Sequence, residues 1–222
     1  MPSLKRKIMT TLPDLLIDGP DDAPVTIALA HGAGAGMEHP FMQAFAEGLA
    51  ARGLRCVRFE FPYMAQRRVD GKKRPPNRAP ILIESWRAVI DHLGRENLII
   101  GGKSMGGRIA SMVARDLEDD GAPVNGLVCL GYPFHPPGKP EKAAGRLAHL
   151  LDIKTPTLIL QGTRDTFGGA EQVPGLGLPA SVGVGWLEDG DHGFKPRKTS
   201  GRTEAQNWAE ALDAMDAFAR AL

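Results

Sequence analysis

A serine lies between two glycines in the stretch Gly102-Lys103-Ser104-Met105-Gly106. This stretch follows the apolar run 98–100 and precedes a helical stripe of apolar residues that begins at Ile109. On such a strand-to-helix turn a serine is held in strained backbone geometry, with its hydroxyl raised above the sheet. The flanking glycines leave room for the strand and the helix to approach closely. The pattern predicts that Ser104 is a nucleophile; a glycine-rich turn with an incidental serine is the simpler alternative.

An aspartate and a histidine with suitable acid–base chemistry follow later apolar runs. Asp165 lies in a glycine-containing loop after the run 157–160, and His192 lies in the loop after the run 182–187. A serine hydroxyl becomes a good nucleophile when a base removes its proton, and a neutral imidazole does this near pH 7. A carboxylate behind the imidazole fixes its tautomer and stabilises the imidazolium. We therefore expect Ser104, His192 and Asp165 to act as nucleophile, base and orienting acid.

Other acidic and imidazole side chains compete for these two roles. Asp189 and Asp191 are so near His192 in sequence that they would have to fold back on it, so they rank below Asp165. His135 follows a predicted strand and is the alternative base. Taken singly, each of these residues is more typical of a solvated turn or a surface loop. The remaining helical histidines are expected at the surface or in packing: His39, His92 and His149.

A loop of small residues, His31-Gly32-Ala33-Gly34-Ala35-Gly36, follows the apolar run 25–30. Small residues allow backbone N–H groups to point into a site, where they stabilise an oxyanion. We expect the N–H groups of Ala33 and Met105 to form this oxyanion hole, with Gly34 as the alternative to Ala33. His31 is expected to hold the loop. A phosphate-binding loop is the competing interpretation, but this run lacks both G-x-G-x-x-G with an acidic partner and G-K-[ST].

The longest stretch without helical or strand periodicity, residues 62–80, is rich in cations opposed only by Asp70. We predict that Arg67 or Arg68 reaches the mouth of the Ser104 pocket and binds an anionic group of the substrate. A solvated basic loop is the alternative. Phe134, with its neighbours Tyr132 and His135, is expected to bound the substrate site. The cations are Arg67, Arg68, Lys72, Lys73, Arg74 and Arg78.

Apolar runs that alternate with helical stripes predict the elements that position these residues. A parallel sheet covered by helices gives this alternation, because its strands are buried on both faces. We therefore predict one α/β domain over residues 1–222, with a mainly parallel sheet of about seven strands and helices on both faces. Residues 132–154 leave room for one short helix, so no large lid is expected. The predicted strands are 12–17, 25–30, 54–61, 98–100, 124–130, 157–160 and 182–187.

The composition is that of an ordinary globular chain, with 42% hydrophobic and 24% charged residues in 222 and a net charge of +1. This charge gives no case for nucleic acid or membrane surfaces, and no run approaches the ~20 apolar residues of a membrane span. The basic start lacks the apolar run of a secretory signal. Cys56 and Cys129 lie in apolar runs, which predicts buried free thiols and a cytoplasmic location. No metal-ligand spacing appears, and no metal or cofactor is expected.

The chain resembles the α/β-hydrolase superfamily over essentially its whole length. The shared features are His31-Gly32, Gly102-x-Ser104-x-Gly106, Asp165 and His192, in the order Ser, Asp, His that this superfamily has. It looks like the small, lid-poor, dienelactone-hydrolase-like branch, and is similar to bacterial relatives of a testis-expressed hydrolase-like family. That closer similarity is carried by three segments: His31-Gly32-Ala33-Gly34, Arg58-Phe59-Glu60-Phe61-Pro62-Tyr63-Met64 and Gly101-Gly102-Lys103-Ser104-Met105-Gly106-Gly107.

The resemblance implies the fold and the catalytic triad but no substrate. From the residues themselves, we predict a serine hydrolase that acts on an ester or related acyl substrate through an acyl-enzyme at Ser104. Dienelactone hydrolases proper carry cysteine at the nucleophile position, where this chain has Ser104. An acyltransferase, or a binding or scaffold protein that keeps the fold without turnover, is the alternative. The sequence leaves the natural substrate and the oligomeric state open.

Overall fold

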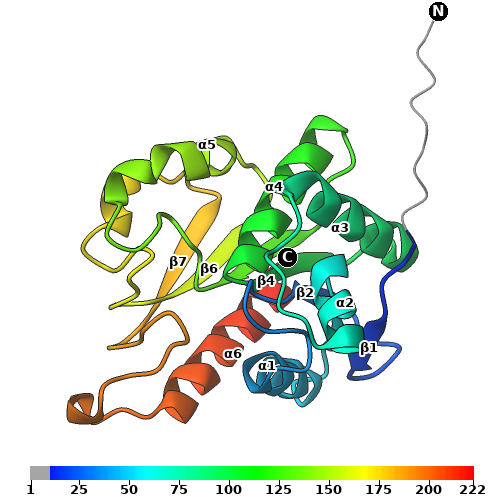
Figure 1. Cartoon of the computed structure of the whole chain (residues 1–222). Helices are drawn as coiled ribbons and strands as arrows, with labels where there is room; N and C mark the ends of the chain where they lie inside the picture. Colours follow the sequence, from blue (N-terminus) through cyan, green and yellow to red (C-terminus); the bar gives the residue numbers. More distant parts are fainter. Residues whose placement is uncertain (1–10) are drawn as a thin grey trace, which may run out of the picture.

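Seven strands form one sheet in the order β1-β3-β2-β4-β5-β6-β7 in a computed structural model, which describes residues 11–222 (Figure 1). Every neighbouring pair is parallel except β1 and β3, which are antiparallel at one edge. The predicted mainly parallel sheet is therefore confirmed. Its strands are β1 (Leu15–Asp18), β2 (Thr26–Ala30), β3 (Arg55–Phe59), β4 (Leu98–Lys103), β5 (Gly126–Leu130), β6 (Thr157–Gly162) and β7 (Val182–Leu187).

The register of the strands brings their C-terminal ends to one edge of the sheet. Ala30 at the end of β2 pairs with Phe59 of β3 and with Gly102 of β4. Lys103 at the end of β4 pairs with Leu130 of β5. In an open parallel sheet, this is the edge where ligands bind. Loops that leave β2, β4, β6 and β7 therefore start beside one another.

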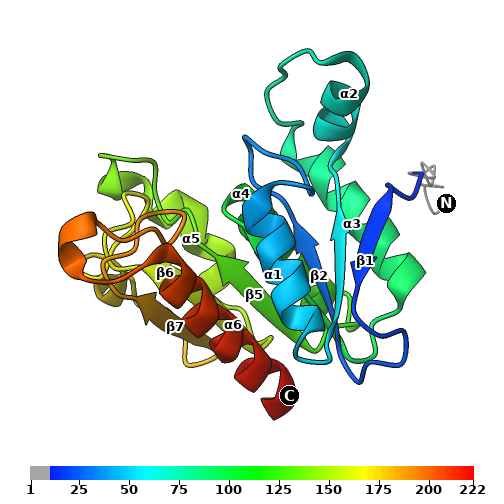
Figure 2. The same ribbon diagram turned by 90° about the horizontal axis from the view of Figure 1, so that it is seen from below.

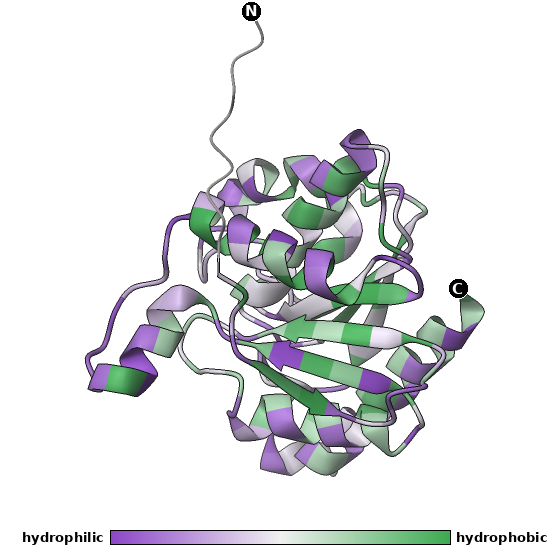
Figure 3. Ribbon diagram, turned by 90° about the vertical axis from the view of Figure 1, so that its right-hand side faces the viewer, coloured by the Kyte–Doolittle hydropathy of each residue, from purple (hydrophilic) through white to green (hydrophobic). Residues whose placement is uncertain are grey.

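Helices cover both faces of the sheet, as the sequence predicts (Figure 2). Two of them, α1 (Pro40–Ala50) and α6 (Glu204–Ala221), pack side by side on one face. The other face is covered by α3 (Ala79–Leu93), α4 (Met105–Asp119) and α5 (Ala144–Leu151). Hydrophobic residues dominate the strands, whereas hydrophobic and hydrophilic residues alternate along the helices (Figure 3). The site thus stands on a sheet that is buried on both faces.

The expectation of a non-periodic stretch over residues 62–80 is wrong for its first half. Helix α2 (Pro62–Asp70) forms there, while α3 begins at Ala79. Proline at the first helical position has no N–H that would need a partner, and its φ suits a helix. Gly71 ends the helix in the left-handed region at φ 70°, and its N–H donates to the carbonyl oxygen of Arg67 at 2.8 Å.

Only a 3₁₀ turn, η1 (Pro140–Lys142), and α5 lie between β5 and β6, so residues 11–222 form no large lid. Within residues 11–222, no helix is long and apolar enough to span a membrane. The first ten residues, which hold the basic start of the chain, lie outside the described residues.

Candidate active site

Ser104 lies between β4 and α4, which confirms its predicted placement on a strand-to-helix turn. Its φ of 53° and ψ of −114° are strained for a residue with a side chain. The turn is possible because position 106 is glycine: a Cβ there would lie 2.6 Å from the carbonyl oxygen of His31. The close approach of loop and helix therefore depends on Gly106.

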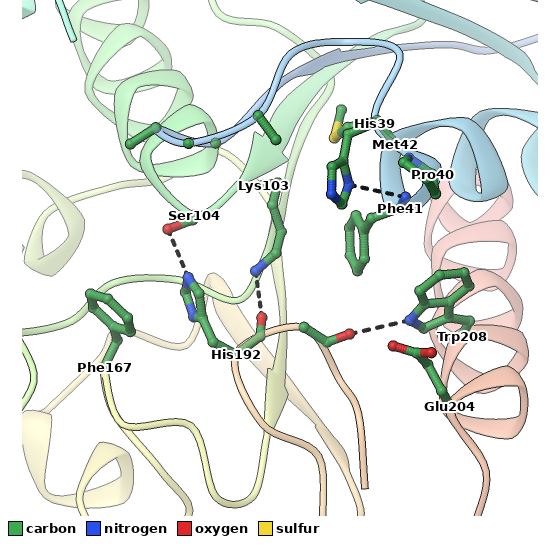
Figure 4. A pocket seen from close by; sticks show the side chains of 15 residues that line it. His39, Pro40, Phe41, Met42, Lys103, Ser104, Phe167, His192, Glu204 and Trp208 are labelled. Atoms are coloured by element: carbon green, nitrogen blue, oxygen red, sulfur yellow. Dashed lines mark hydrogen bonds between the residues drawn. The ribbon is translucent and has the colours of Figure 1, made fainter. Parts of the chain in front are cut away.

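The three predicted side chains meet in one chain of hydrogen bonds. Ser104 Oγ lies 2.8 Å from His192 Nε2 (Figure 4). His192 Nδ1 in turn lies 2.8 Å from Asp165 Oδ2. The Asp165 carboxylate is buried and accepts from Nδ1, so the proton belongs on Nδ1 and Nε2 is free to accept from the serine hydroxyl. Such an arrangement suits proton removal from Ser104.

Gln161, a residue that the sequence analysis missed, holds the carboxylate from behind. Its Nε2 donates to Asp165 Oδ2 at 2.8 Å and to the carbonyl oxygen of Gly168 at 2.9 Å. Its Oε1 accepts from the N–H of Tyr132 at 2.7 Å. The N–H of Phe167 donates to the other carboxylate oxygen at 2.8 Å. The signal available in the sequence was a glutamine directly after the apolar run 157–160, at the end of a strand expected to be buried.

The competing acids have other partners in the structure. Asp189 pairs with Arg197 and Arg164, and hydrogen bonds from Arg197 hold the pKa of its carboxyl below the usual range. Asp191 Oδ1 accepts from the N–H groups of Gly193 and Lys195 at 2.8 and 3.0 Å. Both carboxylates shape the loop that carries the histidine, and Asp165 is the one bonded to the imidazole.

The alternative base, His135, is buried away from the serine. Its Nδ1 lies 2.8 Å from the carbonyl oxygen of Pro136, and its Nε2 lies 3.0 Å from Gln172 Oε1. A separate Ser111–His149 pair, 2.8 Å apart, lies between α4 and α5. Ser111 is fully buried and donates its hydroxyl proton to the carbonyl oxygen of Arg108, so it is not activated by the imidazole.

The two predicted oxyanion donors flank the serine. Met105 is the first residue of α4, where backbone N–H groups have no intrahelical acceptor. Ala33 lies in the loop beside the pocket, and the hydroxyl of Tyr63 lies 3.0 Å from its carbonyl oxygen. His31 anchors the same loop: Nδ1 lies 2.7 Å from the carbonyl oxygen of Gly32, and Nε2 accepts from Phe61 N–H at 3.1 Å.

The buried His31 makes stability sensitive to acid. Burial lowers its pKa to about 4, below the 6.5 of an exposed histidine. Between these two values the unfolded chain binds a proton that the folded chain does not, so stability falls as pH falls. We expect the native protein to lose about 2 kcal/mol more unfolding free energy than His31→Asn between pH 7 and pH 5. Urea unfolding at both pH values measures this; equal losses in the two proteins would contradict it.

An apolar cavity of about 580 Å³ opens beside Ser104 and His192 (Figure 4). Phe167, which the sequence analysis missed, lies against the His192 ring with centroids 4.3 Å apart. Lys103 is the third missed residue, because the variable position of a G-x-S-x-G pattern does not restrict residue type. The other side chains that line the cavity include His39, Pro40, Phe41, Met42, Glu204 and Trp208.

Three predicted substrate-binding residues do not line this cavity. Phe134 is fully buried and packs against Tyr132, with centroids 4.9 Å apart. Arg68 forms ion pairs with Asp14 at 2.9 Å and with Glu60 at 3.3 Å. The prediction that Phe134 bounds the substrate site is therefore wrong, whereas the prediction that Arg67 or Arg68 reaches the mouth of the Ser104 pocket stays a prediction.

Arg67 donates to the carbonyl oxygen of Gly34 at 3.3 Å. With Arg68 it lines a neighbouring depression of about 420 Å³, which meets the Ser104 cavity at Gly34, Ala35 and His39. Because α2 is a helix rather than a free loop, its two arginines face this depression instead of the cavity.

Comparison with known proteins agrees with this geometry. A family model described as an alpha/beta hydrolase domain matches residues 23–220, so the chain belongs to the α/β-hydrolase family. A serine hydrolase homologue from Coxiella burnetii is similar, with 22% identity, a TM-score of 0.66, and coverage of 94% of this chain and 90% of that one.

Two further structures are similar in fold. A serine hydrolase without a lid from Xanthomonas campestris is 19% identical, with a TM-score of 0.66 and coverage of 93% of this chain and 88% of that one. A dienelactone hydrolase from Anabaena variabilis is also 19% identical, with a TM-score of 0.66 and coverage of 92% and 89%. These similarities agree with the lidless α/β architecture.

Proposed function

We propose that this protein is a serine hydrolase that cleaves esters or related acyl compounds through a covalent intermediate on Ser104. The observation that carries the proposal is the Ser104–His192–Asp165 chain, with both hydrogen bonds at 2.8 Å, beside an apolar cavity. The separation of Ser104 Oγ from His192 Nε2 is within the reach needed for proton transfer. A cavity of this size suits a small molecule.

The reaction follows from the positions of these groups. His192 Nε2 takes the proton of Ser104 as Oγ attacks the acyl carbon, and the negative charge forms on the former carbonyl oxygen. The N–H groups of Met105 and Ala33 stabilise this oxyanion. His192 then returns the proton to the leaving alcohol. Water attacks the acyl-enzyme by the same route in reverse, which frees the acid and restores Ser104.

Labelling with a fluorophosphonate tests the nucleophile. The native protein is expected to form one adduct, and peptide mapping should place it on Ser104, because the phosphorus centre mimics the attacked acyl carbon. Ser104→Ala should not react. Labelling that persists in Ser104→Ala, or a native protein that neither labels nor hydrolyses any ester in a screen of small acyl esters, would overturn the proposal.

Acyl transfer and a non-catalytic scaffold are the competing functions. Acyl transfer shares the acyl-enzyme, and adding an alcohol acceptor to the ester assay distinguishes it by the ester product formed. A scaffold has no physical need for three side chains in one hydrogen-bonded line, so the observed contacts support catalysis.

The proposed location is the cytoplasm, and the proposed partner is a small acyl substrate. Cys56 and Cys129 are free and buried, as the sequence predicts. Burial raises the pKa of the Cys56 thiol to about 12 and raises that of Cys129 as well, so neither is a competing nucleophile. Free thiols suit a reducing compartment.

A further inference from the structure

Three successive carbonyl groups in the loop that carries His192 each accept a hydrogen bond from a side chain outside the loop. The carbonyl oxygen of His192 accepts from Lys103 Nζ. That of Gly193 accepts from Trp208 Nε1 at 3.2 Å, and that of Phe194 accepts from Asn207 Nδ2 at 2.7 Å. Two of these donors come from α6, whereas the third comes from β4.

Lys103 differs from the other two donors because it is the neighbour of the proposed nucleophile in the chain. It is the last residue of β4, and Ser104 follows it directly. The backbone segment that positions Ser104 therefore also carries the ammonium group that binds the carbonyl oxygen of His192. Figure 4 shows the lysine side chain running along the cavity wall from beside Ser104 to His192.

Two aromatic rings lie close to the ammonium group of Lys103. Its Nζ lies 5.4 Å from the ring centroid of Phe41 and 5.7 Å from that of Phe194, which are cation–π distances. Burial lowers the pKa of Lys103 to about 8, so the side chain is mainly protonated at neutral pH. Hydrogen bonds from an ionised donor are stronger than neutral ones.

Gly131, the residue directly after β5, provides the space for this contact. A Cβ at position 131 would lie 2.6 Å from Lys103 Nζ, 2.8 Å from the carbonyl oxygen of His192 and 3.3 Å from His192 Nδ1. Its φ of 65° also favours glycine. The ammonium group of Lys103 and the backbone of His192 thus lie against Gly131, in space that the side chain of a larger residue at position 131 would fill.

We propose that Lys103 is a positioning residue, whose ammonium group fixes the backbone of His192 and thereby sets the imidazole at hydrogen-bonding distance from Ser104. This inference rests on the proposed function. Asp165 holds one ring nitrogen, and the lysine holds the main chain from which the ring projects, so the base is fixed at two points. Small displacements of a catalytic group are costly, because proton transfer requires close approach.

The test compares Lys103→Met, which keeps the apolar stem and loses the ammonium group, with Lys103→Arg, which keeps a charged donor. We expect Lys103→Met to lower kcat by roughly 10- to 100-fold on a neutral ester while KM changes by less than about threefold. Lys103→Arg should restore most of kcat. Lys198→Met, which removes an exposed lysine from a turn further along the chain, is the matched control and should keep the native kcat.

A measurement without substrate separates this inference from the proposed function. In crystal structures, Ser104 Oγ and His192 Nε2 should move beyond hydrogen-bond reach in Lys103→Met and stay within it in Lys103→Arg. If the native protein failed to label at Ser104, the hydrolase proposal would be overturned. The crystallographic distance between Ser104 and His192 would still test the positioning role of Lys103. Native kcat and an unchanged distance in Lys103→Met, or equal losses in the two variants, would overturn the role of Lys103.

Discussion

Replacing Ser104 with alanine is expected to lower kcat by about 10⁶-fold, because no other group in the site can form the acyl-enzyme. His192→Ala should lose a similar amount. The double variant should be hardly worse than either single variant, since the two side chains act as one unit. Steady-state hydrolysis of a short neutral ester measures all three. If the decrease in kcat of the double variant equalled the product of the two single decreases, the serine and the histidine would act independently.

The second Ser–His pair provides a matched control for this prediction. Ser111 lies on α4 and, like Ser104, contacts a histidine at 2.8 Å, but it is fully buried and its proton is donated to a backbone carbonyl. Ser111→Ala should change kcat by less than about threefold and lower stability by about 1–3 kcal/mol, because His149 and Tyr132 lose a buried partner. A loss of activity as large as that of Ser104→Ala would reassign the nucleophile.

Asp165→Asn is expected to lower kcat by about 10⁴-fold with little change in the fold. The asparagine amide would place an N–H donor where the carboxylate now accepts from His192 Nδ1 and Gln161 Nε2. The imidazole would then carry its proton on Nε2, which faces Ser104 and could no longer accept the serine proton.

Asp191→Asn is the control for the loss of an acid close to the base. Asp191 bonds to backbone N–H groups through one oxygen, and an asparagine carbonyl can replace that acceptor. Its kcat should stay within about threefold of the native value. The pair is compared in the same ester assay, and a larger loss in Asp191→Asn than in Asp165→Asn would exchange the roles of the two acids.

The positions of Ser104, Asp165 and His192 could be predicted because each follows the end of a parallel strand. Strand ends are visible in the sequence as limits of apolar runs, and parallel strands bring their ends to one edge. The chemistry of the residues then selects among the few polar side chains at that edge. Asp189 also follows a strand end, and the sequence favours Asp165 over it because Asp189 is so near His192 that it would have to fold back; the structure pairs Asp189 with arginines.

The directions of side chains around the cavity could not be predicted in the same way. Arg68 pairs with Asp14, which is 54 residues away in sequence, and with Glu60, and Phe134 is buried in the core. The roles of Lys103 and Gln161 depend on contacts with backbone carbonyls and with a buried carboxylate. Such contacts leave no periodic signal, because they follow from tertiary packing and not from local spacing.

The strand order also determines when the site can exist during folding. Ser104 and His192 are 88 residues apart in the chain, and Asp165 and His192 are 27 residues apart. Contacts of such high sequence separation form slowly, because the chain between them must first lose much of its conformational entropy. The histidine loop follows β7, an edge strand that pairs only with β6, so the three side chains meet only after that last strand has docked. An intermediate in which the sheet ends at β6 would contain the nucleophile and the acid without the base, and would be catalytically inactive.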